Sequence, residues 1–150
     1  MNVFVTVGTT SFDRLVKASD ECASIIKEYD FIFQIADGSY TPLNGSSFGF
    51  VDSVDSYYNH SDIVITHAGA GSVYNLLELH KKLVVVPNLE RVDKHQRDLA
   101  GFLEENNYAL VVWDLDRLLN ILKSVKAFQP AKFEKDPFFK YEEIASYLLS

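Results

Sequence analysis

Short apolar segments alternate with amphipathic segments along most of this chain. Continuous runs rich in β-branched and aromatic residues are typical of strands buried on both faces, whereas apolar residues spaced three and four apart are typical of helices packed on a sheet. Because strands and helices alternate, the sequence predicts an α/β fold in which a parallel sheet is flanked by helices. The predicted strands cover residues 3–7, 31–36, 48–51, 62–66, 83–86 and 109–113.

The predicted helices lie between these strands, and two of them have polar residues where a helix should begin. Thr10, followed three residues later by Asp13, fits a capping pattern, and Asp114 can cap a helix after the last strand. No repeat, low-complexity segment or internal boundary interrupts the pattern, so residues 1–150 are predicted to form one domain. The predicted helical segments are residues 10–28, 52–61, 72–80, 93–106, 114–122 and 144–149.

The chain is acidic, with a formal net charge of −7, and contains a single cysteine. An acidic chain lacks the basic faces that release counterions from nucleic acid, so we expect no nucleic-acid partner. Cys22 lies on the apolar stripe of a predicted helix, which favours a packed thiol over a nucleophile. Without a signal peptide or an apolar run of about 20 residues, we expect a cytoplasmic location.

The turn from His67 to Ser72 is the strongest candidate for a binding site. In open α/β sheets, ligands bind at the carboxyl ends of the strands, and this turn joins a buried strand to a helix. Gly69 and Gly71 would let a ligand approach the backbone, and the helix would direct free N–H groups at an anion. The turn matches neither the P-loop nor the G-x-G-x-x-G pattern. A phosphate site and a turn that needs its glycines for packing both remain open.

Two further polar turns are expected at the same edge of the sheet. Gly8-Thr9-Thr10 follows the first strand, and a turn from Asn88 to His95 and Gln96 follows the strand at 83–86. Gln96 could hold sugar hydroxyls, although a helix cap and a solvated loop would also explain these turns. The histidines form no H-x-x-x-H pair, so no metal site is predicted.

Three segments together resemble the C-terminal, donor-binding domain of the glycosyltransferases that include the bacterial lipid II synthase. They are residues 6–15 (TVGTTSFDRL), 65–73 (ITHAGAGSV) and 84–88 (VVVPN), the last leading to His95-Gln96. The chain is most similar to free-standing single-domain members of that family. These are the catalytic subunit of the eukaryotic UDP-N-acetylglucosamine transferase that acts on dolichol-linked sugar, and short bacterial subunits of exopolysaccharide and capsule glycosyltransferases.

The resemblance implies the C-terminal, Rossmann-like half of a GT-B fold and a UDP-sugar donor. Enzymes of this architecture generally need no bound metal, because a helix N-terminus stabilises the leaving UDP, so no metal or other cofactor is expected. The implied donor-binding residues are Gly8, Thr9 and Thr10 facing the cleft between domains, Gly69, Ala70, Gly71 and Ser72 around the diphosphate, His95 and Gln96 near the transferred sugar, and also His67 and Asn88.

One position departs from the family pattern. Relatives usually carry a glutamate on the helix after the glycine turn, where it holds the ribose hydroxyls, and this position is Asn75 here. An amide binds hydroxyls more weakly than a carboxylate does. Glu78, nearly one helical turn further, could take over this role.

A complete GT-B enzyme places its active site between two Rossmann-like domains, so the resemblance also implies a partner subunit. That membrane-associated partner would supply the acceptor-binding domain, the general base and the attachment to the membrane. The chain would then lie at the inner face of the membrane through its partner, and the acceptor would be a lipid-linked saccharide. The apolar final segment, residues 138–149, would pack either on the partner or on the chain's own sheet.

The function expected from the sequence is therefore the UDP-sugar-binding, catalytic subunit of a two-subunit hexosyltransferase in bacterial exopolysaccharide or capsule biosynthesis. The alternative is a non-catalytic subunit that enhances a partner transferase without holding the donor, which Asn75 keeps open. A third interpretation is a flavodoxin-like binding or signalling domain. That class should place an acidic cluster at the end of the first strand, where this sequence has Gly8-Thr9-Thr10.

Overall fold

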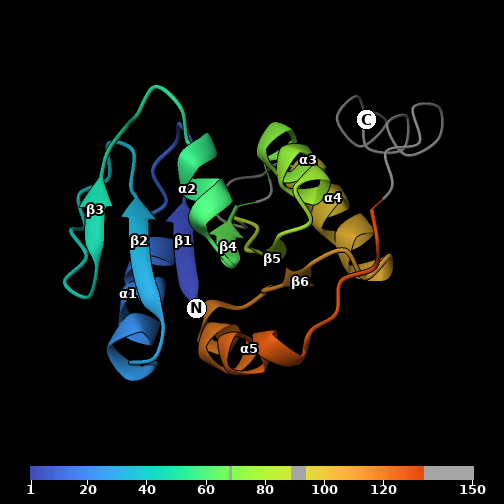
Figure 1. Cartoon of the computed structure of the whole chain (residues 1–150). Helices are drawn as coiled ribbons and strands as arrows, with labels where there is room; N and C mark the ends of the chain where they lie inside the picture. The colour runs from blue at the N-terminus through green and yellow to red at the C-terminus, as the bar shows by residue number, and fades with distance from the viewer. Residues whose placement is uncertain (68, 89–93, 134–150) are drawn as a thin grey trace.

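The computed structural model describes residues 1–67, 69–88 and 94–133, and these residues form a six-stranded parallel sheet (Figure 1). The strand order is β3-β2-β1-β4-β5-β6. The order reverses between β1 and β4, which is the switch point of a doubly wound sheet. The predicted α/β class is confirmed. The strands are β1 (Asn2–Thr6), β2 (Asp30–Gln34), β3 (Ser46–Phe48), β4 (Ile63–Thr66), β5 (Lys82–Val85) and β6 (Leu110–Val111).

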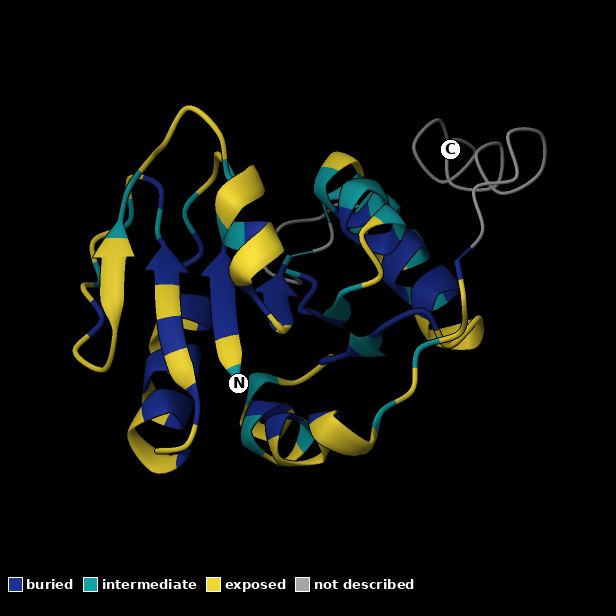
Figure 2. Cartoon of the chain, viewed as in Figure 1, coloured by how far each residue is buried: buried dark blue, intermediate teal, exposed yellow. Residues whose placement is uncertain are grey.

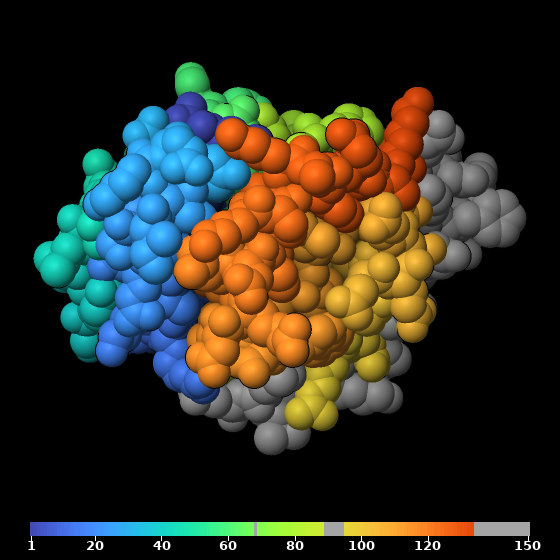
Figure 3. Space-filling view, turned by 90° about the horizontal axis from the view of Figure 1, so that it is seen from below, coloured from blue at the N-terminus to red at the C-terminus, as the bar shows by residue number. Residues whose placement is uncertain are grey.

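Helices cover both faces of the sheet (Figure 1). One face carries α1 and α5, which lie side by side in the view of Figure 3, and the other carries α2, α3 and α4. No helix in the described ranges is both long and apolar enough to cross a bilayer. The helices are α1 (Asp13–Ile25), α2 (Asp55–His60), α3 (Ala70–Glu78), α4 (Lys94–Glu105) and α5 (Leu118–Ser124), with 3-10 turns at Leu115–Arg117 and Val125–Ala127.

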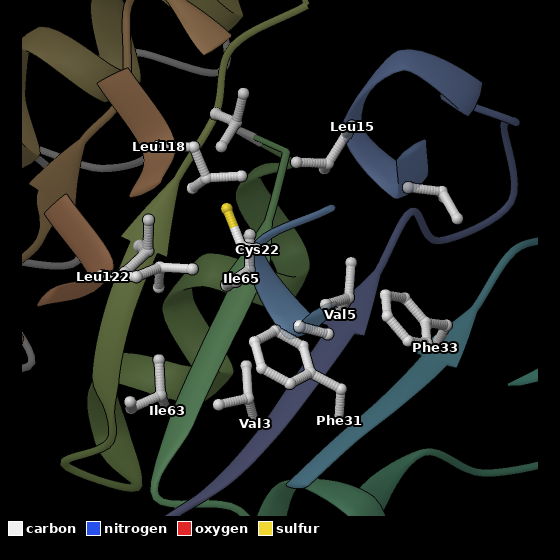
Figure 4. Packing of buried hydrophobic residues seen from close by; sticks show 14 of the residues in the cluster. Val3, Val5, Leu15, Cys22, Phe31, Phe33, Ile63, Ile65, Leu118 and Leu122 are labelled. Atoms are coloured by element: carbon white, nitrogen blue, oxygen red, sulfur yellow. The ribbon is translucent and has the colours of Figure 1, made fainter. Parts of the chain in front are cut away.

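Side chains that alternate along the strands build one core on each face of the sheet. Along β1, Val3 and Val5 face α1 and α5, whereas Phe4 faces the opposite helices. Figure 4 shows the first core, in which Leu15 of α1 and Leu118 of α5 meet the valines. Strands β1, β4 and β5 are buried along almost their whole length, whereas β2 has two exposed residues and most of the edge strand β3 is exposed (Figure 2). This burial on both faces explains why the strands are continuous apolar runs.

Cys22 lies inside the first core, where burial raises the pKa of its thiol to about 11, with a smaller contribution from the charge of Glu21. At pH 8 only about one thiol in a thousand would be ionised, and the thiolate is the reactive form. We therefore expect Cys22 to resist alkylation in the folded protein and to react fully in 6 M guanidinium chloride. Labelling with a maleimide under both conditions measures this, and rapid labelling of the folded chain would contradict it.

The start of α1 differs from the sequence prediction. The helix begins at Asp13, Phe12 occupies its N-cap position, and no side chain among the described residues caps it. The capping pattern of Thr10 and Asp13 was therefore the wrong interpretation. The Asp13 carboxylate instead accepts a hydrogen bond from the backbone N–H of Ser39 at 3.1 Å, in the β2–β3 loop.

The other end of the chain agrees with the prediction only in part. The Asp114 carboxylate caps the turn after β6 by accepting the N–H of Asp116 at 3.0 Å. The turn that it caps is 3-10, and α5 follows at Leu118. The strand predicted at 109–113 is reduced to Leu110–Val111. The helix predicted at 144–149 lies outside the described residues.

A buried carboxylate on α1 holds the β2–β3 loop against the helix. Asp20 is 2% exposed and accepts hydrogen bonds from the Tyr40 hydroxyl at 2.5 Å and from the backbone N–H of Leu43 and of Asn44 at 3.0 and 2.9 Å. Burial of this carboxylate would raise its pKa, but the hydrogen bonds together lower the pKa. The same contact raises the pKa of Tyr40 to about 12. One side chain therefore fixes the loop that leads into β3.

Candidate functional site

The three polar turns are numbered in chain order: the first is residues 8–10, the second is residues 67–72 and the third is residues 88–96. The first and second turns meet at the switch point between β1 and β4. Gly8 has a φ of +70°, a conformation that favours glycine. A Cβ atom added to Gly8 would lie 3.1 Å from Cε1 of His67, so the imidazole packs directly on the first turn. The half-buried His67 therefore joins the two turns, as expected from their position at one edge of the sheet.

The two glycines of the second turn have different roles. A Cβ atom on Gly69 would lie 2.8 Å from Nε2 of His67, so this glycine makes room for the chain's own histidine. A Cβ atom on Gly71 would meet no described atom within 4 Å. Packing therefore explains Gly69, whereas Gly71 leaves open space outside the domain. The packing interpretation of the turn fits Gly69, and the phosphate-site interpretation stays a prediction at Gly71.

The first turn of α3 presents backbone N–H groups at this open space. Gly69 is the N-cap residue, and the first helical hydrogen bond runs from the N–H of Val73 to the Gly69 carbonyl at 3.0 Å. The N–H groups of Ala70, Gly71 and Ser72 precede that bond, where helices bind anions. Within α3, which the structure describes in full, the first turn carries no acidic side chain. The arrangement suits a negatively charged ligand.

A pocket of about 160 Å³ adjoins this helix end, on the α2 side of the sheet. It brings together residues from the first two turns, namely Gly8, Thr9 and Ser72. The rest of its lining comes from Thr6, Gln34, Phe50, Val51, Val54 and Tyr58, which the sequence analysis did not select. Phe50 and Val51 are 62% and 44% exposed. The sequence predicted them inside a strand at 48–51, but the observed strand ends at Phe48, so both residues lie in the loop after β3.

Ser72 is held in this pocket by a residue of α2. The hydroxyl groups of Ser72 and Tyr58 form a hydrogen bond. Tyr58 is 3% exposed, and this burial raises the pKa of its phenol above the ordinary value. The phenol is therefore neutral at physiological pH and fixes the Ser72 side chain without adding charge.

The third turn lies apart from this pocket. Gln96 uses its side-chain oxygen within the protein, where it accepts the backbone N–H of Asn88 at 3.2 Å. Asn88 lines a second pocket of about 360 Å³ together with Arg14 and Trp113. Residues 89–93 of the turn lie outside the described residues.

The remaining predicted residues are not gathered around the first pocket. Thr10 is exposed and does not line it, and His95 lies in the first turn of α4. Asn75 and Glu78 are half-buried further along α3, at spacings of three and six from Ser72. In the part of the chain that the structure describes, no three side chains of the kinds that bind metals form a cluster.

A doubly wound parallel sheet with a glycine-containing turn at its switch point defines the class of Rossmann-like α/β domains. Within that class, residues 2–138 match the glycosyltransferase family 28 C-terminal domain, and this chain belongs to that family. The expected relationship to the glycosyltransferases that include the lipid II synthase is confirmed.

Similar proteins agree with this assignment. Human UDP-N-acetylglucosamine transferase subunit ALG13 is 40% identical over 118 residues, which are 71% of this chain and 10% of the human protein. The solution structure of ALG13 has a TM-score of 0.68 at 20% identity, and the match covers 98% of this chain and 96% of that one. Acinetobacter baumannii MurG has a TM-score of 0.69 at 18% identity, over 83% of this chain and 41% of that one. At such identities the structures show the fold, which is the C-terminal half of the GT-B architecture.

The prediction of a hexosyltransferase subunit in bacterial exopolysaccharide or capsule biosynthesis is wrong. Curated relatives come from human, mouse and Saccharomyces cerevisiae, and their shared name specifies UDP-N-acetylglucosamine. These findings fit better the alternative, a non-catalytic subunit that enhances a partner transferase. The motifs could not separate the sugars, because a glycine turn at a helix N-terminus recognises phosphate, which all UDP-sugars share.

Proposed function

We propose that this chain is a partner-dependent subunit of a UDP-N-acetylglucosamine transferase, and that it forms the nucleotide-binding wall of the active site. The observation that carries the proposal is the open position at Gly71, where the N-terminus of α3 adjoins a pocket lined by both polar turns. The name shared by the curated relatives supports the donor and the role as a subunit. The chain spans only 10% of the length of the mouse and human proteins, so an activity like theirs is a proposal for this chain.

In this proposal the diphosphate of the donor lies at the start of α3. The N–H groups of residues 70–72 and the positive end of the helix dipole would stabilise the charge that develops on the leaving UDP. Electrostatic stabilisation of this kind needs no bound metal, and we propose none. The nucleotide base would enter the pocket, where Phe50 and Val51 offer apolar surface and Thr6 and Thr9 offer hydroxyl groups. Asn75 or Glu78 would contact the ribose from the same helix.

The partner subunit would complete the active site from the opposite side. We propose that it binds a lipid-linked saccharide acceptor, supplies the general base and attaches the complex to the cytoplasmic face of a membrane. The support is the subunit status of the relatives and the family's membership of the GT-B architecture. On this proposal the chain by itself binds donor and transfers nothing.

Calorimetric titration tests the donor site directly. We expect UDP and UDP-N-acetylglucosamine to bind the chain, and ADP at the same concentrations to bind more weakly. Transfer of labelled N-acetylglucosamine should appear only when the partner is added. Absence of UDP binding with the partner present would favour a subunit that enhances the partner without holding donor. Robust transfer by the chain alone would contradict the dependence on a partner.

A further inference from the structure

Gln34, the last residue of β2, uses its whole side-chain amide inside the protein. It is 3% exposed. Its Oε1 accepts hydrogen bonds from the Thr6 hydroxyl at 2.6 Å and from the backbone N–H of Val7 and Gly8 at 3.1 and 2.9 Å. Its Nε2 donates to the carbonyls of Gly8 and Gly49, both at 2.8 Å. Hydrogen-bond donors surround the Oε1 atom and backbone carbonyls surround the Nε2 atom, so only one orientation of the amide fits.

These hydrogen bonds join two segments that lie on either side of β2. Gly8 follows β1, and Gly49 follows β3 and immediately precedes Phe50 and Val51. Both segments contribute to the 160 Å³ pocket, Gly8 from one side and Phe50 and Val51 from the other. The regular pairing of β1 with β2 ends at Thr6 and Gln34. Beyond that point, the Gln34 side chain binds both the N–H and the carbonyl of Gly8.

We propose that Gln34 is a positioning residue for the nucleotide pocket, which sets the separation of the Gly8 turn from Phe50 and Val51. This inference rests on the proposed function. Both N–H groups of the amide are already used within the protein, so Gln34 acts through the backbone that it holds. A side chain of similar size without the amide would remove the hydrogen bonds from Gln34 to the carbonyls of Gly8 and Gly49 and to the N–H of Gly8. The N–H of Gly8 would retain the Thr6 hydroxyl at 3.4 Å, and the Gly49 carbonyl would retain the N–H of Ala36 at 3.1 Å, but the link between the two segments would be lost and they would shift.

Gln34→Leu tests the inference, with Phe31→Leu as the matched control. Phe31 is on the same strand and packs into the core on the opposite face, so its truncation lowers stability without touching the pocket. We expect Gln34→Leu to remain folded by circular dichroism and to bind UDP at least about tenfold more weakly, because several buried hydrogen bonds are lost. Phe31→Leu should bind UDP as the wild type does. Equal UDP affinity of folded Gln34→Leu and wild type would overturn the inference.

Gln34→Glu provides a readout that a purely structural role would not give. The ionised carboxylate places an oxygen against the carbonyls of Gly8 and Gly49, whereas the protonated carboxyl can donate to one of them. The UDP affinity of Gln34→Glu relative to wild type should therefore rise as the pH falls from 8 to 5.5. A ratio that does not change with pH would contradict the proposed role of the amide.

A measurement without nucleotide separates this inference from the proposed function. Amide exchange and chemical shifts of Gly8 and of residues 49–51 should change in Gln34→Leu and remain unchanged in Phe31→Leu. If the wild type binds no UDP but these shifts occur, the proposed function fails and the positioning by Gln34 stands. If the exchange and shifts of Gly8 and of residues 49–51 are the same in Gln34→Leu and wild type, the positioning role is wrong, whether or not the wild type binds UDP.

Discussion

Gly71→Asp is expected to remove UDP binding while leaving the domain folded. A Cβ atom at this position meets no described atom within 4 Å, so the side chain has room. An acidic residue in the first turn of a helix is favourable, and replacement of a helical glycine gains up to ~1 kcal/mol. The carboxylate would occupy the anion position of α3 and repel the donor diphosphate. Two unit charges 4 Å apart near a protein surface repel by about 4 kcal/mol, which exceeds a hundredfold in affinity.

Gly71→Ala is the control for this substitution, because it adds a methyl group without charge. We expect Gly71→Ala to bind UDP within a few-fold of wild type and to melt at the same or a higher temperature. Titration calorimetry and thermal unfolding of the three proteins measure both effects. If Gly71→Asp bound UDP as tightly as the wild type does, the diphosphate would not lie at the start of α3.

Asp20→Ala is expected to cost about 3 kcal/mol of the free energy of unfolding, because two backbone N–H groups and the Tyr40 hydroxyl lose a buried, charged acceptor. For a chain of this length the loss corresponds to a fall in melting temperature of about 6–12 °C. Urea unfolding measures the free energy. Exposed Glu21→Ala, the neighbouring substitution, should change it by less than about 0.5 kcal/mol. Equal stabilities of Asp20→Ala and Glu21→Ala would contradict the role given to Asp20.

The contribution of Asp20 to the free energy of unfolding should also decrease at low pH. Although burial alone would raise its pKa, the hydrogen bonds from Tyr40, Leu43 and Asn44 make the folded-state pKa lower than the unfolded one. The unfolded state therefore binds the proton first as the pH falls below about 4. The stability from Asp20 is complete above that pH and is lost as the pH falls through the folded-state pKa. The difference between wild type and Asp20→Ala should thus be smaller at pH 3 than at pH 7, and a constant difference would refute the assignment.

The fold could be predicted from the sequence because β1, β4 and β5 are buried on both faces. Residues 62–66 form a nearly continuous apolar run for that reason, and the observed strand, Ile63–Thr66, differs by one residue. Local patterns failed where a distant group competes for the same side chain. Thr10 and Asp13 fit a helix-capping pattern in sequence, but Phe12 occupies the N-cap position and the Asp13 carboxylate accepts the N–H of Ser39 in the β2–β3 loop.

The polar turns of the candidate site could be predicted from the sequence, but the pocket residues between those turns could not. A glycine turn after a buried strand identified the start of α3, but only coordinates separate Gly69, which His67 needs, from the open Gly71. The pocket lining comes from separate parts of the chain: Gln34 from β2, Phe50 from the loop after β3 and Tyr58 from α2. No short sequence motif contains all three residues. Gln34 did leave a signal, because an amide inside an apolar strand must find buried partners.

The position of β1 has a consequence for how the chain folds. Its neighbours in the sheet are β2 and β4, and β4 begins about sixty residues further along the chain. Every strand pairing in the described sheet is parallel, so each one needs a crossover before it can form. Such distant contacts slow folding to milliseconds or longer. During synthesis, the first strand of this domain therefore waits until residue 66 has left the ribosome before both of its edges are paired.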